Sequence, residues 1–440
     1  MKSPVRFITV MFVSAHAIAF AQQQPSAPMI PTTPAQPLSI GAATTAALQQ
    51  VSALQQAQID EAIAAQDVRQ AEAAFLPRVR DSFTVAYNSP AHPPGSPADP
   101  SFIAQNAVHE YQNLLGVAGD WNFGLFAAIR RSKALLEAAR AGTEIARRAF
   151  IRAVNETYYA AALATAKRTA AEQSLGAAEE FERVTDLNFR AGEVPEIDVI
   201  RARLQSAARR DDLAQARQAE AIANAALGTL LGYGIDRAPV IETLPQQVDV
   251  NELENLTTAG VARRPEFAQL EAQVRAAHAD IGVARAERLP KITYSVDQGF
   301  DTTSLSPADV RQHRGILAMA NVDVPIFDWG ASRSRQRQAE LRARGAELQR
   351  QLIIRDLYLQ FATARQGAIT AAERVDNARR AVADAQRNAT ISISRYRAGE
   401  APITEVTDAL TTLATQRATL QQALFDYQVA HAHLLEAVGQ

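Results

Sequence analysis

The chain has 440 residues, a formal net charge of −2 and no cysteine. The missing cysteines exclude disulfides, thiolate metal sites and cysteine nucleophiles. The mixed charge excludes the concentrated positive field of a nucleic-acid-binding protein, so nucleic acid is not an expected partner.

The N-terminus predicts a cleaved secretory signal over residues 1–21. Lys2 and Arg6 precede an apolar run over residues 7–20, and small residues precede an expected cleavage after about Ala21. The alternative is a buried N-terminal helix. Residues 22–44 then predict a proline-rich, extended leader. Without cysteine we expect no lipid attachment at the mature N-terminus.

An internal duplication organises the rest of the chain. Four landmarks recur in the same order, roughly two hundred residues apart, which is far longer than the ~20 to 50 residue periods of solenoid repeats. Each half has a Leu-Pro helix end, an aromatic-Gly turn, an apolar and tyrosine-bearing helical segment, and an Arg-Ala-Gly-Glu turn. The matched positions are Pro77 and Pro290, Gly124 and Gly330, Val154 and Ile354, and Phe189 and Tyr396.

This duplication predicts two structural repeats, at 45–231 and 258–440, joined by a linker at 232–257 that would lie at the equator of the helical part. Each repeat should hold an opening helix, a strand pair and a long helical hairpin. The expected strand pairs are 78–122 and 290–327, and the expected hairpin turns lie near 190–195 and 397–402.

The hairpins are predicted from proline-free stretches at 125–188 and 331–395. At ~1.5 Å per residue each would extend roughly 95 Å. At the turns, Gly192 and Gly399 can adopt positive φ, and Pro195 and Pro402 can open the returning helix. We therefore expect shorter helices to stack end to end beside each long helix in an antiparallel, coiled-coil-like layer.

The strand pairs are the candidates for contact with lipid. No stretch after the signal approaches ~18 uninterrupted apolar residues, so membrane insertion would have to use strands. Ile292, Tyr294 and Val296 alternate with polar residues, which is typical of a sheet with one apolar face. Four strands cannot close a bacterial membrane barrel of about eight or more, so several copies would have to share strands. The alternative is a small soluble sheet that caps a helical bundle.

Taken together, these features resemble the TolC-type outer-membrane efflux protein family over essentially the whole mature chain. The matching elements are the duplicated order, the PIFDWG turn ending at Gly330, the ARRPEF segment at Ala262 to Phe267, and the paired RAGE turns. The resemblance implies a homotrimer with a twelve-stranded outer-membrane β-barrel continuous with an α-helical barrel in the periplasm. It also implies docking to a periplasmic adaptor (membrane fusion protein) and an inner-membrane pump.

The resemblance places the two turns at the periplasmic tip and implies gate residues there. By position these are Asp198, Glu405, Asp408 and Tyr396, which would form rings of carboxylate and phenol that favour cations. They could equally be ordinary solvated helix residues. The family's best-studied gate has an arginine two residues after the second turn glycine, where this chain has Ala401, so the gate bonding must differ.

Two further sets of residues are expected at contact surfaces. Gly192, Pro195, Gly399 and Pro402 form the tip turns, and the resemblance implies that the adaptor docks there. Trp121 and Trp329 fall where strands leave the sheet, so they are candidates for membrane-interface aromatic residues or for ordinary packing at a junction.

A search for catalytic motifs finds no phosphate-binding loop, dinucleotide fingerprint, zinc-protease helix or nucleophile elbow. His431 and His433 are two apart and point to different sides of a helix. We therefore expect no metal, no cofactor and no enzymatic activity.

The function predicted is a passive, homotrimeric exit duct of a tripartite efflux pump, in the outer membrane with a long periplasmic portion, exporting small molecules such as drugs and toxic solutes. The alternatives are a periplasmic coiled-coil adaptor, which needs one hairpin flanked by β domains, and a coiled-coil structural protein without a pore. The sequence does not separate drug, metal and protein export.

Overall fold

The computed structural model describes residues 37–91, 101, 103, 106–233 and 239–439. The predicted signal and residues 22–36 of the predicted leader lie outside these residues, as do parts of the first strand loop and of the linker. The described residues all belong to one compact unit, which begins at Pro37.

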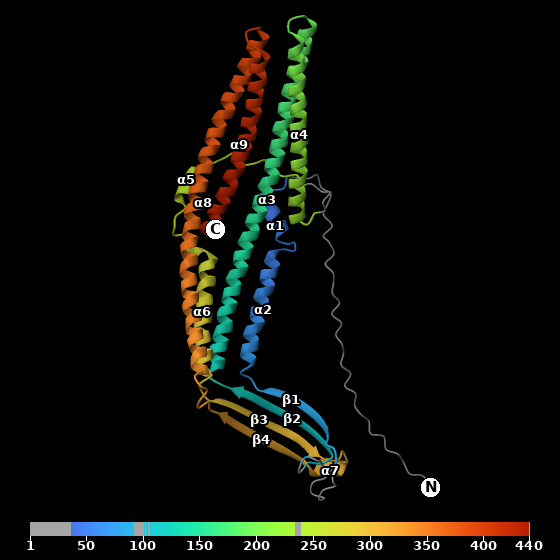
Figure 1. Cartoon of the computed structure of the whole chain (residues 1–440), viewed down its shortest axis with the longest axis vertical. Coiled ribbons are helices and arrows are strands. Elements are labelled where there is room, and N and C mark those ends of the chain that lie inside the picture. Colours follow the sequence, from blue (N-terminus) through green and yellow to red (C-terminus); the bar gives the residue numbers. More distant parts are fainter. Residues whose placement is uncertain (1–36, 92–100, 102, 104–105, 234–238, 440) are drawn as a thin grey trace, which may run out of the picture. The chain divides into compact units, whose positions relative to one another are not determined.

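Two helices of equal length dominate the fold (Figure 1). Helix α3 spans Gly124–Arg190 and helix α8 spans Ala331–Arg397, each with 67 residues, or about 100 Å. Each reverses into a 35-residue helix, α4 at Glu196–Leu230 and α9 at Ile403–Ala437. The chain therefore contains two long antiparallel hairpins, α3–α4 and α8–α9.

Shorter helices cover the halves of α3 and α8 that lie away from the hairpin tips. Helix α2, at Ala53–Ala73, packs on α3, and helix α6, at Pro265–Ala286, packs on both α3 and α8. Figure 1 shows α2 and α4 following one another along α3.

The N-terminal helix corrects two expectations. Helix α1 begins at Ile40, inside the segment predicted as an extended leader to residue 44, because the prolines end at Pro37 and the Ser39 hydroxyl caps the helix at Ala42 N (3.3 Å). The opening helix is also divided: α1 ends at Ala47, and α2 begins only after Ser52, which has an extended backbone.

The linker between the repeats carries α5 at Val250–Asn255 and leads to a 3-10 turn at Val261–Arg263. Two tyrosine hydroxyls anchor it. Tyr158 donates to the Leu38 carbonyl (2.7 Å) and accepts from Glu242 N (3.2 Å), while Tyr427 accepts from Asp249 N (3.1 Å). The linker is thus fastened to both hairpins near their bases.

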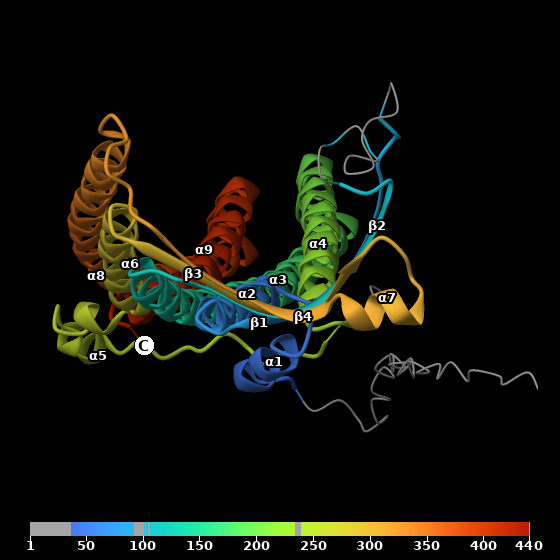
Figure 2. The same cartoon turned by 90° about the horizontal axis from the view of Figure 1, so that it is seen from below.

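Four antiparallel strands form one sheet in the order β1-β2-β3-β4. The strands are β1 at Arg78–Tyr87, β2 at His109–Trp121, β3 at Lys291–Thr302 and β4 at Arg314–Asp323, and a short helix α7 at Pro307–Gln312 lies between the last two. Figure 2 shows the sheet as a curved strip. Strand β4 ends before the expected residue 327, because Pro325 has no N–H for a ladder.

The register divides the sheet into two faces of different character. Pairs such as Val79–Val117 and Val117–Val296 alternate with pairs such as Arg80–Gly116 and Gly116–Asp297. We call the first the apolar face; it carries Val79, Phe83, Val85, Tyr87, Leu115, Val117, Trp121, Ile292, Tyr294, Val296, Ile316, Ala318, Ala320 and Val322. The second is the polar face, with Arg78, Arg80, Ser82, Thr84, Gln112, Asp120, Lys291, Ser295, Asp297, Asp301, Asn321 and Asp323. The division is not complete: Asp81, Asn113 and Gln298 lie on the apolar face, and Leu114, Leu317 and Met319 lie on the polar face.

The largest cluster of buried side chains lies where the linker meets α8 and α9. It gathers Leu253, Val261, Val375, Leu424 and Leu434, all fully buried, with several alanines of α8. A second cluster joins α1 to α3 and α4 around Val154 and Leu227. Alanine lets the helix backbones approach closely. The predicted fold class, mainly α with a four-stranded antiparallel sheet, is confirmed.

Candidate functional site

The two hairpin turns share one backbone geometry. Gly192 has φ +82° and Gly399 has φ +74°, the left-handed conformation that favours glycine. In the first turn Glu193 N donates to Asn188 O, and in the second Glu400 N donates to Arg395 O, both at 2.9 Å. These backbone bonds, which join residues five apart, end α3 and α8 in Schellman motifs.

The returning helices begin in the same way. Pro195 and Pro402 occupy the N-cap positions, and Asp198 and Glu405 lie in the first turns of α4 and α9. A carboxylate at a helix N-terminus is favoured by the helix dipole. The structure therefore gives these two acids equivalent positions at the tips of the two hairpins.

A direct contact joins the two tips. The hydroxyl of Tyr396, on α8, donates to Asp198 Oδ2 on α4 at 3.3 Å. The Tyr396 ring meets Phe181 of α3 edge to face, with centroids 5.4 Å apart, and both belong to an apolar cluster with Ile403 and Val406. Burial, and then the negative charge of Asp198, raises the pKa of the Tyr396 hydroxyl, which keeps the donor protonated.

The other two predicted acids have different surroundings. Glu405 bonds within its own hairpin, accepting from Arg395 Nη1 (2.6 Å) and Ser392 Oγ (3.3 Å). Asp408 is exposed, and the described part of the chain gives it no hydrogen bond or ion pair. The structure thus brings Asp198 and Tyr396 together, places Glu405 in a separate contact, and leaves Asp408 facing outward.

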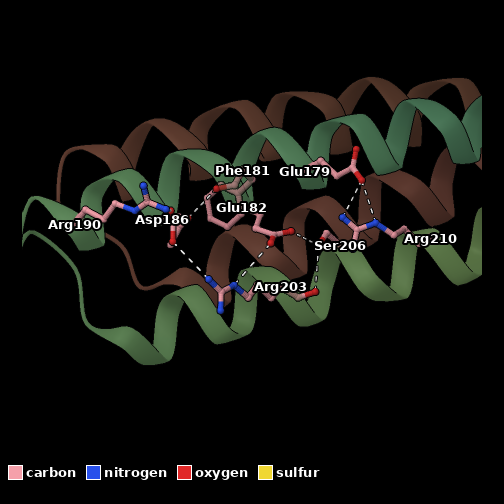
Figure 3. Close-up of polar contacts among 9 residues, drawn as sticks. Glu179, Phe181, Glu182, Asp186, Arg190, Arg203, Ser206 and Arg210 are labelled. Atoms are coloured by element: carbon pink, nitrogen blue, oxygen red, sulfur yellow. Dashed lines mark hydrogen bonds and ion pairs between the residues drawn. The ribbon is translucent and has the colours of Figure 1, made fainter.

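A ladder of ion pairs binds α3 to α4 next to the first tip (Figure 3). Asp186 and Glu182 face Arg203 at 3.6 and 3.9 Å. Two turns further along α4 from the tip, Arg210 bonds Glu179 at 2.9 Å. The ladder continues with Glu172–Arg217 (3.6 Å) and Arg168–Glu220 (2.7 Å). Glu182 also accepts a bond from the buried Ser206 hydroxyl.

Sequence reasoning missed this ladder, although a signal was present. Acids stand seven residues apart at 172, 179 and 186, and arginines stand seven apart at 203, 210 and 217. The two series mirror one another about the turn, which is the pattern that aligned heptads produce in an antiparallel hairpin. Arg395, the partner of Glu405, was also missed.

The tryptophans lie at the junctions of strands and helices. Trp121 ends β2 and packs edge to face on Phe123 at 4.8 Å. Trp329 lies six residues beyond the end of β4, has φ +57° and is 90% exposed, with its ring 4.9 Å from that of Phe327. Exposed apolar side chains therefore gather where β4 leads into α8.

Neither a membrane-crossing helix nor a metal-binding cluster occurs among the described residues. No helix among them has the length and apolar character needed to cross a membrane, and their acidic and histidine side chains form no cluster of three or more that is suited to a metal ion.

Comparison with known proteins identifies relatives over both halves. The family model described as "Outer membrane efflux protein" matches residues 44–233 and 259–440. Protein CyaE of Bordetella pertussis is 30% identical over 52% of this chain, a stretch that spans 48% of CyaE. The cation efflux system protein CusC of Escherichia coli K12 is 26% identical over 76% of this chain and 73% of its own.

A solved structure has the same fold. The outer membrane protein VceC of Vibrio cholerae superposes with a TM-score of 0.78 at 20% identity, covering 91% of this chain and 96% of VceC.

Proposed function

Because the chain belongs to the outer membrane efflux protein family, we propose that three copies form a passive exit duct that crosses the outer membrane and is gated at the hairpin tips. The observation that carries this proposal is the sheet. Its outer strands β1 and β4 are almost entirely exposed, and each has a partner on one side only.

The exposed apolar face of the sheet supports assembly in a membrane, in addition to its unpaired edges. Val79, Phe83 and Ile316 on the apolar face are 71%, 58% and 71% exposed, which suits lipid rather than water. An open edge is not tolerated in lipid. Three copies would close a barrel of twelve strands, with the polar face lining the lumen and Trp121 and Trp329 at the membrane interface.

The gate in this proposal is the contact between the tips. With Tyr396 bonded to Asp198, each α8–α9 hairpin is held against α3–α4, and three copies would narrow the duct. The family's best-studied gate forms its bonds through an arginine at the position of Ala401. In this chain the ion pair between Arg395 and Glu405 would take the place of that bonding. Asp198, Glu405 and Asp408 would give the entrance a negative charge that favours cations.

The partners of the duct would supply the energy that drives export through it. We infer a periplasmic adaptor that docks near Gly192, Pro195, Gly399 and Pro402, and an inner-membrane pump that loads small molecules such as drugs and toxic solutes. The duct itself would carry no catalytic group.

Conductance in planar bilayers tests this function. The purified protein should form channels with low resting conductance and a preference for cations. The double variant Asp198→Ala, Glu405→Ala should conduct more at rest and lose part of that preference, whereas Glu180→Ala, an exposed acid of α3, should not. If the correctly assembled protein forms no channel, the exit-duct proposal is wrong; if the double variant behaves as wild type, these acids are not in the gate.

A further inference from the structure

The two edges of the sheet carry complementary charges. We propose that an ion pair between Arg80 of one subunit and Asp323 of the next stabilises the seam where β4 meets β1 of the neighbouring copy. This inference rests on the trimer proposed above. The partner is therefore a second copy of this chain.

The register places both residues on the polar face. Arg80 is opposite Gly116, Gly116 is opposite Asp297, and Asp297 is opposite Leu317. Asp323 lies six residues, an even number, after Leu317, so it projects from the same side. Any pairing of β4 with β1 that keeps the faces continuous must shift by even numbers of residues.

The helices next to the sheet limit how far β4 of one copy can shift along β1 of the next, and so determine which residues of the two strands lie opposite each other. Strand β1 begins at Arg78, shortly after α2 ends at Ala73, and β4 ends at Asp323, shortly before α8 begins at Ala331. In a cyclic trimer each strand end lies at one height in all copies, and both of these ends adjoin the helical part, so β4 of one copy meets β1 of the next near full overlap. Full overlap of the two ten-residue strands sets Asp323 opposite Arg78, and a stagger of two residues sets it opposite Arg80. Arg80 is then a direct or a diagonal neighbour of Asp323, and a long side chain reaches across either position.

The two charges are available for this contact. Within the described part of the chain, neither the Arg80 nor the Asp323 side chain takes part in a hydrogen bond or ion pair. Lys291, which lies opposite Asp323 on β3, pairs with Asp120 instead, at 3.9 Å. Arg78, by contrast, already bonds Asp120 within its own chain at 2.8 Å. Both free charges lie on the strands that a neighbouring copy would cover, which makes them complementary across the seam.

The apolar face is complementary as well. Near the middle of the edge strands β1 presents Phe83 and Val85, which are 58% and 59% exposed, and β4 presents Ala318 and Ala320. Both registers set Phe83 opposite one of the alanines. The large Phe83 ring thus meets a small side chain of the other edge in either register.

Charge reversal tests the pair. Arg80→Glu and Asp323→Lys should each lower the temperature at which detergent-solubilised trimers dissociate, because each sets like charges face to face. The double variant R80E/D323K should recover most of that loss. The matched control R80E/D301K changes the same charges but places the lysine on the inner strand β3, so it should recover nothing. A double variant no more stable than the single variants would overturn the pair.

Cysteine cross-linking tests the same contact without charge reversal, in case the charge-reversed variants assemble poorly. Since the chain has no cysteine, Arg80→Cys with Asp323→Cys offers only the introduced thiols to a short bis-maleimide. Strands β1 and β4 of one chain are separated by two others, or about 14 Å, so the product should be a covalent trimer. Ala86→Cys with Asp323→Cys, at opposite ends of the strands, should give monomers. A wild-type protein that is not a trimer contradicts the proposed function, whereas a trimer with neither rescue nor cross-link contradicts the Arg80–Asp323 pair alone.

Discussion

The two hairpins have equal lengths and equivalent turns, but different interactions hold them together. Arg203 faces Asp186 and Arg210 faces Glu179 in the first hairpin. The positions that match by the turn spacing in the second hairpin are Leu410 with Ile393, which pack against one apolar cluster, and Arg417 with Gln386, which share a hydrogen bond at 2.6 Å. Duplicated halves can therefore keep a fold while the contacts at matched positions change from ion pairs to an apolar contact and to a hydrogen bond with a neutral partner.

This difference predicts that different perturbations destabilise the two hairpins. The second hairpin should be sensitive to cavities, since burial supplies its stability. The first should be sensitive to screening of charge, since exposed ion pairs weaken in salt. The contact between the tips belongs to both hairpins and should respond to changes on either side.

The largest effect should come from a cavity in the second hairpin. Leu413 is 6% exposed and packs with Ala385, Ala389 and Ala409. Leu413→Ala should cost about 2–5 kcal/mol of local stability, seen as faster amide hydrogen exchange in α8–α9. Leu213, equally buried in α4, is the control, and Leu213→Ala should cost less because Leu213 belongs to none of the apolar clusters among the described residues. An equal or greater loss for Leu213→Ala would contradict the comparison.

Alkaline pH should have the next largest effect. The pKa of Tyr396 is raised by burial and by the charge of Asp198, so the native state holds this proton more tightly than the unfolded chain. The stabilising contribution is complete below the ordinary tyrosine pKa of about 10 and is lost as pH rises through the raised pKa. Resting conductance should stay constant to about pH 10 and rise above it. A rise that persists in Tyr396→Phe would have another origin.

At neutral pH, Tyr396→Phe should have a smaller effect. It removes the hydrogen bond to Asp198 while keeping the ring against Phe181, a loss of about 0.5–1.5 kcal/mol. Resting conductance in planar bilayers should increase modestly. Tyr358→Phe, on the exposed part of the same helix, should leave it unchanged, and equal behaviour of the two variants would remove Tyr396 from the gate.

The smallest effect should come from the ladder. Arg203 contacts Glu182 and Asp186, but its side chain is 62% exposed, so Arg203→Gln should cost no more than about 1 kcal/mol. Hydrogen exchange at the tip of α3–α4 should quicken slightly, as it should for wild type in 1 M salt. Arg183→Gln breaks a pair within α3 alone and serves as the control. Faster exchange in α8–α9 rather than α3–α4 would contradict the assignment.

Local patterns were sufficient to predict much of the fold. The Gly-Glu-x-Pro segments determine both turns, because only glycine adopts the required φ without strain and proline opens a helix readily. Alternation along β3 and the Leu-Pro pairs located the strands. The heptad-spaced charges about the first turn would have predicted the ladder as well, since aligned heptads bring those positions together.

Features that depend on placement in space were harder to predict. The bond from Tyr396 to Asp198 joins residues 198 positions apart, and no periodicity states how two hairpins lie against each other. The break between α1 and α2 depends on the packing of α1 against α3 and α4. The partner of Asp323 would lie in another copy of the chain, beyond any pattern within one sequence.

Whether several copies share their strands in the outer membrane can be measured as the mass of the protein extracted from outer-membrane fractions in mild detergent, corrected for bound detergent. We expect a stable particle of three chains. A monomer in the soluble periplasmic fraction would mean that the edges of β1 and β4 remain unpaired in water, and would exclude strand sharing between copies.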